Sequence, residues 1–304
     1  DEDLRWLSRG EARDRVAADR VFGATWTPHC AAVHPARLVR GLAEAVERRG
    51  VTIHEGTTVT AVEPHRVRTP AGDVRAGVVV RALEGYTASL RGRRRDLLPL
   101  YSLMLATEPL SDDVWAELRW SGRETLGDAR RLIIYAQRTA DGRIAIGGRG
   151  APYRLASRIR PAHEQARGVH TAIRHSLVEL FPRLAGAAVT HRWGGVLGVP
   201  RDWWPSVRHD PATGLASAGG YAGDGVAMSH LAGRTLADLV TGTDSELTRL
   251  PFVGHRSRRF EPEPLRWIGV NTGLKLAAAI DERERRTGRP ARLLDGVMTR
   301  LTGH

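Results

Sequence analysis

A glycine-rich turn between an apolar segment and a helical pattern limits the fold of this chain more than any other feature. Residues 215–218 predict a short strand and residues 226–240 predict a helix. The turn between them holds Gly219, Gly220, Gly223 and Gly225. Glycines let a ligand approach bare backbone, and a helix N-terminus offers unpaired N–H groups with a partial positive charge. On spacing alone, two interpretations stay open: a site for an anion or an electron-rich ring edge, and a tight turn that binds nothing.

This turn is not the dinucleotide fingerprint G-x-G-x-x-G, which follows the first strand of a βαβ unit. After Gly223 and Gly225, Met228 stands where the third glycine should be, and the segment lies late in the chain.

The sequence shows neither a Ser/His/Asp arrangement nor a metal-ligand cluster. His163, His170 and His175 share one predicted helix but lack the spacing of a zinc pair. We therefore expect no metal site and place these histidines on a solvated face.

The predicted pattern of helices and strands changes twice along the chain, which predicts three parts. Residues 1–95 alternate helix and short strands, residues 96–200 look mostly antiparallel, and residues 201–304 return to the first style. The expected strands are 51–54, 58–62, 77–82 (buried on both faces), 100–107, 189–196 and 215–218, with a hairpin around residues 140–142. The expected helices are a polar helix or connector at 1–20, then 35–50, 112–120, 163–184, 226–240 and two more after residue 263.

Composition excludes several classes of protein. With 304 residues and 41% hydrophobic content, a packed core is feasible. The net charge of +12 comes almost wholly from scattered arginines, with Lys275 the single lysine, and no nucleic-acid motif accompanies it. Cys30 is the only cysteine, which fits a reduced, cytoplasmic setting without a disulfide. No apolar run reaches the roughly 18 residues of a membrane span, and the charged first twenty residues do not form a secretory signal.

Four stretches together resemble one enzyme family. They are residues 34–38, which open a helix before the segment at 50–53; residues 58–62; residues 78–86, which end a strand; and Trp193–Gly194–Gly195 followed by Asp202, Pro205 and residues 219–227. In order and spacing they resemble the FAD-dependent oxidoreductases of the D-amino-acid oxidase, glycine oxidase and sarcosine oxidase (DAO) family, nearest to its gamma-glutamylputrescine oxidase-like branch.

The resemblance implies an α/β fold with an α+β insert. Residues 1–95 would be part of an FAD/NAD(P)-binding Rossmann-like domain, N-terminally truncated. Residues 96–200 would be an inserted antiparallel-sheet substrate domain, and residues 201–304 would return to the FAD-binding domain and add a helical tail.

The resemblance also implies the cofactor, FAD, and the residues that hold it. The backbone of Val59 would pair with the adenine. The strand end from Ala82 to Gly85 would line the dinucleotide crevice. The remaining cofactor-binding residues would be Gly219, Gly220, Gly223, Asp224, Gly225 and Val226, with the helix that follows aimed at the N1/C2=O edge of the flavin.

Two departures from the family pattern accompany these matches. The first strand, glycine loop and acidic residue of the family have no counterpart, and Arg81 and Glu84 place charge where the family has small or polar residues. We therefore expect either a truncated flavoenzyme, with a possible partner chain that supplies the missing N-terminal half, or a catalytically inactive binding or scaffold protein on a decayed flavoprotein fold.

For the family, the resemblance implies hydride transfer from a substrate C–N carbon to the flavin, for which no strong acid–base residue is required; the catalytic residues stay unknown. Glycine and D-amino-acid oxidases hold the substrate carboxylate with an arginine, and Leu197 stands at the matching position. This predicts an amine or polyamine derivative as substrate rather than a simple α-amino acid. Tyr101, Tyr135 and Arg149 are candidate substrate contacts from the inserted sheet, with ordinary packing as the competing interpretation.

Overall fold

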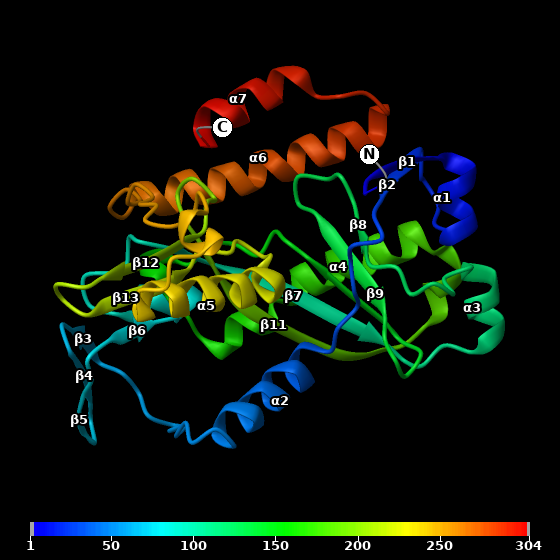
Figure 1. Cartoon of the computed structure of the whole chain (residues 1–304). Helices are drawn as coiled ribbons and strands as arrows, with labels where there is room; N and C mark the ends of the chain where they lie inside the picture. The colour runs from blue at the N-terminus through cyan, green and yellow to red at the C-terminus, as the bar shows by residue number, and fades with distance from the viewer. Residues whose placement is uncertain (1–2, 303–304) are drawn as a thin grey trace.

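A five-stranded antiparallel sheet carries the largest hydrophobic core of the protein (Figure 1). A computed structural model describes residues 3–302 of the chain. The strand order is β11-β7-β10-β9-β8, with β7 at Leu98–Thr107, β8 at Leu126–Gly127, β9 at Ile134–Arg138, β10 at Ile144–Gly148 and β11 at Val189–Val199. Leu103 and Leu105 of β7 are fully buried and pack with Ile173 and Leu177 of helix α4 (Arg167–Leu180).

The alternation of β7 and the hairpin of β9 and β10 both follow from the local sequence. Alternate residues of β7 point to the α4 side and to the opposite face, which is the period-2 pattern of a strand. The hairpin between β9 and β10 closes at Thr139, whose amide donates to the carbonyl of Arg143, while Gly142 takes a φ of +72° that suits glycine. The predicted hairpin is confirmed.

A smaller sheet carries the glycine turn. Its order is β12-β13-β6, with β12 at Ser206–Asp210, β13 at Leu215–Gly219 and β6 at Val79–Arg81. Strand β13 pairs with β6 in parallel and with β12 antiparallel. Helix α5 (Gly225–Thr241) covers one face through Ala232 and Leu236, which pack on Val207 and Ala216.

Strand β6 is an edge strand, so the prediction that its segment is buried on both faces is wrong. Val79 is buried, but Val80 is 49% exposed. Within residues 3–302, β13 is the only strand paired with β6. Residues 51–54 also form no strand, contrary to expectation.

The N-terminal region folds differently from the expected polar helix or connector. It forms strand β1 (Arg5–Ser8), helix α1 (Arg9–Arg15) and strand β2 (Gly23–Trp26), and Ser8 caps α1. Helix α2 (Pro35–Glu47) and the sheet of β3 (Ala61–Glu63), β4 (Arg66–Thr69) and β5 (Gly72–Arg75) lie at the bottom of the view in Figure 1. No residue of α2 is buried.

The remaining helices connect and cover these sheets. Helix α3 spans Asp112–Leu118, and short 3-10 helices span η1 Glu84–Ser89, η2 Leu155–Ser157, η3 Pro161–Gln165, η4 Pro182–Gly186 and η5 Glu246–Arg249. The predicted long helix at 163–184 is therefore broken into η3, α4 and η4. The break between α4 and η4 comes directly before Pro182, which begins η4, whereas the break between η3 and α4 lies at Ala166 and has no proline.

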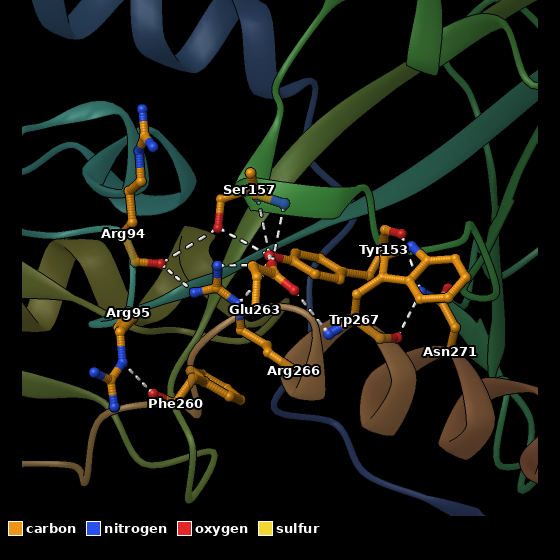
Figure 2. A network of polar contacts seen from close by, with 10 residues as sticks. Arg94, Arg95, Tyr153, Ser157, Phe260, Glu263, Arg266, Trp267 and Asn271 are labelled. Atoms are coloured by element: carbon orange, nitrogen blue, oxygen red, sulfur yellow. Dashed lines mark hydrogen bonds and ion pairs between the residues drawn. The ribbon is translucent and has the colours of Figure 1, made fainter.

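Helices α6 (Leu265–Thr287) and α7 (Arg292–Thr302) cross the top of the molecule (Figure 1). They turn at Gly288, which has a φ of +63°, as the predicted split near residues 288–290 requires. Arg266 lies at the start of α6 and is 3% exposed. It donates hydrogen bonds to the carboxylate of Glu263 and to the carbonyl of Arg94 (Figure 2). The same carboxylate accepts from the hydroxyl of Tyr153 at 2.7 Å.

None of the helices in residues 3–302 has the length and apolar character needed to cross a membrane. All five strands of the large sheet, β7 to β11, fall within the predicted inserted part, whereas the division at residues 95 and 200 stays a prediction.

Candidate functional site

The turn after β13 depends on glycine. Gly220 and Gly223 take φ values of +82° and +120°, which an L side chain rarely adopts. A β-carbon at Gly220 would also meet Pro200 at 3.3 Å. The turn therefore brings bare backbone to the start of α5, as the sequence predicts.

Glu84 holds the first half of this turn. It lies three residues after the end of β6. Its carboxylate accepts hydrogen bonds from the amides of Gly220 (2.7 Å) and Tyr221 (3.1 Å). Burial raises the pKa of Glu84, although these amides act in the opposite direction. Burial and the charge of Glu84 raise the pKa of Tyr221 to about 12. The charge that departs from the family pattern thus has a structural partner in this chain.

The N-terminus of α5 stays open. Its N-cap residue, Asp224, makes no side-chain capping bond, and Gly223, Asp224 and Val226 are exposed. The first amides of an uncapped helix have no partner within the helix, so they face outward with the positive end of the helix dipole. These groups fit the electron-rich edge of a flavin ring, whereas the Gly220 amide is already used by Glu84.

Arg149 reaches the same turn from the end of β10. Its Nη2 donates to the carbonyl of Ala222 at 2.8 Å, and its guanidinium lies 5.2 Å from the ring centroid of Trp203. A β-carbon at Gly223 would lie 2.9 Å from Arg149 Nη2 and 3.9 Å from Leu197 Cδ1. The structure therefore brings Arg149, Leu197 and Gly223 together, although they lie far apart in the sequence.

The two predicted tyrosines point to different faces of the large sheet. Tyr135 hydrogen-bonds Ser102 through its hydroxyl, and burial raises its pKa. Tyr101 is 5% exposed, points to the face packed on α4, and exchanges hydrogen bonds with the backbone of Arg160. Because Tyr101 is buried in the core on this side of the sheet, it acts in packing, and only Tyr135 lies on the more open face.

The other predicted cofactor residues do not all lie at the glycine turn. Val59 precedes β3, on a separate sheet from the turn. Ala82 is exposed at the end of β6, whereas Gly85 is buried, and a β-carbon there would lie 2.9 Å from Val196 Cγ2. Gly225 begins α5, with the ring of Tyr221 3.7 Å from where its β-carbon would be.

Of the three histidines predicted on a solvated face, only His175 is exposed. His170 is 4% exposed rather than solvated, because its side of α4 faces the carbonyl of Trp193 on β11. His163 lies on η3 against Tyr101, and His175 is exposed. Among the described residues, no group of three or more His, Cys, Asp or Glu side chains is placed to hold a metal ion.

Sequence reasoning missed two features of this region. One is the contact of Arg149 with the turn; the other is a row of Arg208, Ser217 and Arg81 across the small sheet. The available signal was one arginine in each of two short strands, but strand pairing decides which side chains meet.

Comparisons with known proteins identify the family of this chain. The family model described as "FAD dependent oxidoreductase" (DAO) matches residues 1–239. The chain is 29% identical to the probable oxidoreductase OrdL of Rhizobium meliloti, covering 81% of this chain and 56% of that protein. It is 30% identical to gamma-glutamylputrescine oxidoreductase of Escherichia coli, covering 84% of this chain and 60% of that protein.

Solved structures share the fold. The crystal structure of glycine oxidase from Geobacillus kaustophilus superposes with a TM-score of 0.69 at 24% identity, over 84% of this chain and 67% of that one. The chain thus spans little more than half the length of the curated relatives named above. The predicted α/β fold and the predicted family are both confirmed: this chain belongs to the DAO family of FAD-dependent oxidoreductases.

Proposed function

We propose that this protein oxidises a C–N bond of an amine or amino-acid substrate with FAD as its cofactor. The observation that carries the proposal is the open N-terminus of α5 behind a turn of positive-φ glycines. The names of its relatives, which include gamma-glutamylputrescine oxidoreductase and glycine oxidase, support the same reaction class.

Gly223, Asp224, Gly225 and Val226 would hold the ring of the cofactor. A bound flavin supplies the hydride acceptor. The residues of this chain contribute electrostatics: the exposed first amides of α5 stabilise negative charge at the ring edge. Arg149 keeps the turn in place through Ala222 and adds a positive charge beside it.

We further propose an amine or polyamine derivative as the substrate. Leu197, which lies beside Gly223, brings an apolar side chain to the position of the carboxylate-binding arginine in amino-acid oxidases of the family. Tyr135 and Ser102 share the open face of the large sheet and offer hydroxyl groups to a substrate amine. The single cysteine, Cys30, supports a reduced, cytoplasmic setting.

The first test is the visible absorption spectrum of the purified chain before and after addition of FAD. We expect a flavin spectrum that travels with the protein through gel filtration. Gly223→Ala should weaken FAD binding, because it strains the turn and meets Arg149. Gly242→Ala is the matched control: Gly242 has a φ of +71° at the far end of α5, with open space around it. Equal FAD binding by both variants would contradict the proposed site.

Substrate specificity is tested on the FAD-loaded protein. Glycine, D-alanine and gamma-glutamylputrescine are compared by the rate of flavin bleaching without oxygen. Faster bleaching by the two free amino acids would contradict the proposed preference.

Two observations favour a second function, a catalytically inactive binding or scaffold protein. Glu84 occupies two turn amides that a cofactor would otherwise reach, and β6 leaves a free edge. The free edge supports pairing with a strand of a partner chain. A folded chain that takes up no FAD at any concentration would favour this alternative.

A further inference from the structure

Two adjoining cavities border the small sheet, and arginine dominates the wall they share. Their volumes are about 560 and 290 Å3. Both are lined by Arg81, Arg93, Arg208, Ser217 and Arg256. We call this shared region the arginine cavity.

Strand register explains why two of these arginines meet. Ser217 of β13 lies opposite Arg208 of β12 on one side and opposite Arg81 of β6 on the other. Directly opposed residues point to the same face of a sheet, and the neighbouring Val207 and Ala216 point to α5 instead. Two guanidinium groups therefore flank a small hydroxyl side chain, which leaves space above β13.

The charges of Arg81 and Arg208 are poorly compensated. The side chain of Arg81 is only 14% exposed, and the carboxylate oxygen of Asp96 lies 3.8 Å from it, beyond hydrogen-bond distance. Arg81 Nη1 and Arg208 Nε are buried without a hydrogen-bond partner among the described residues. Burial, together with Arg93 for Arg81 and Arg256 for Arg208, lowers the pKa of each guanidinium. Arginine nevertheless stays protonated in proteins, so both guanidinium groups stay positively charged while each keeps a buried N–H group that has no acceptor among the described residues.

The carboxylates in the wall are engaged with other groups. Asp96 pairs with Arg93 and Arg259, each at 3.2 Å. Glu63 pairs with Arg68 at 2.9 Å, and Asp210 accepts hydrogen bonds from Thr213 and Ala212. The arginine cavity therefore keeps an excess of positive charge.

We propose that the arginine cavity binds an oxyanion of the phosphate class, with Arg81 and Arg208 as its main ligands. The planar guanidinium donates two parallel hydrogen bonds to phosphate oxygens, which chloride cannot accept in that geometry. The excess of positive charge in the cavity suits an anion that carries more than one negative charge. The anion is either a free phosphate or pyrophosphate or the phosphate of a nucleotide. The smaller cavity also reaches Gly219 and Gly220 of the proposed cofactor site, but Arg81 and Arg208 are not among the residues proposed to hold FAD.

The test is isothermal titration of the whole chain with inorganic pyrophosphate, in buffer free of phosphate and at ionic strength held constant with NaCl. We expect saturable binding. Because a charge-assisted bond is lost, Arg81→Gln and Arg208→Gln should each weaken it about tenfold or more. Arg40→Gln, on the exposed face of α2 and outside both cavities, should bind as the wild type does.

A parallel titration with ADP identifies the source of the anion. Tighter binding of ADP than of pyrophosphate assigns the site to a nucleotide, and equal or weaker binding assigns it to the free anion. Absence of saturable binding by both ligands would overturn the proposal, as would wild-type affinity in the two variants.

Thermal unfolding without phosphate checks the charge argument separately. Since Arg208 lacks a compensating anion, Arg208→Gln should unfold at the wild-type temperature or above it. A clearly lower unfolding temperature would show that Arg208 already has an internal partner and would contradict the proposal. Arg208→Lys, which keeps the charge but loses the planar fork, should bind pyrophosphate with intermediate affinity.

Discussion

At the scale of single residues, Glu84 shows how an unfavourable charge is used. Its carboxyl is costly to ionise because it is buried, yet it accepts two amides of the glycine turn. Its sequence position predicted only a departure from the family; its partners, more than a hundred residues away, follow from the fold. The glycine turn was predictable because its residues are adjacent, whereas Glu84 and Arg149 reach it through tertiary contacts that no local pattern encodes.

The raised pKa of Glu84 predicts a pH dependence of stability. Below its unfolded pKa the carboxyl is protonated in both states. As pH rises from there through the raised folded value, the unfolded state loses its proton first, so the free energy of unfolding falls. Glu84→Gln should flatten this decline, measured by urea unfolding between about pH 4 and pH 8. An equally steep decline in the variant would assign the effect to other groups.

Gly85 predicts a steric effect close to the same turn. A β-carbon there would lie 2.9 Å from Val196 Cγ2 and 3.1 Å from the carbonyl carbon of Leu197. Gly85→Ala should therefore lower the free energy of unfolding by about 1–3 kcal/mol. Gly77→Ala is the control, since nothing lies within 4 Å of its β-carbon position; it should change stability by less than about 0.5 kcal/mol. Equal effects of the two substitutions would contradict the packing argument.

At the scale of elements, strands were predictable where both partners lie in the chain. The hairpin of β9 and β10 and the long strands β7 and β11 pair with one another, and the alternating pattern of β7 signals this burial. Residues 51–54 carry the same β-branched signal but pair with nothing in the described structure. A strand needs hydrogen-bond partners for its backbone, and composition does not reveal whether they exist. The single helix predicted at 163–184 was wrong at its C-terminal end for a different reason, because Pro182 interrupts it.

Two arginines of helix α6 form ion pairs of the same spacing, one buried and one exposed, which allows a controlled comparison. Arg266 and Arg285 both lie on α6 and both pair with a glutamate three residues earlier, but their side chains are 2% and 45% exposed. Arg266→Met would leave Glu263 without its cation and would leave the carbonyl of Arg94 with only the hydroxyl of Ser157 as a donor (Figure 2). Loss of one partner of a buried pair costs about 3–5 kcal/mol, whereas Arg285→Met should cost less than about 1 kcal/mol. Urea unfolding measures both, and similar losses would rule out burial as the cause.

At the scale of the whole molecule, the two parts of the fold differ in how fully they bury their apolar side chains. The large sheet buries a continuous core, whereas the small sheet, α2 and the sheet of β3 to β5 leave apolar side chains uncovered. Leu38, Val39 and Leu42 on α2 are 51%, 65% and 61% exposed. The sequence predicted a helix here from its apolar spacing, but not that its apolar side would stay uncovered, because coverage depends on neighbours distant in sequence.

This uncovered face predicts concentration-dependent self-association. Exposed apolar patches on monomers mark association surfaces or aggregation sites. Leu42→Gln should reduce the sedimentation coefficient at high protein concentration, while the free energy of unfolding changes by less than about 0.5 kcal/mol, as for other surface substitutions. Leu103→Ala, at a fully buried position, supplies the contrast: it should cost about 2–5 kcal/mol because it leaves a cavity in the core. If Leu42→Gln were as destabilising as Leu103→Ala, α2 would have to pack its apolar side against the rest of the chain. Unchanged sedimentation with unchanged stability would instead show that α2 does not mediate association.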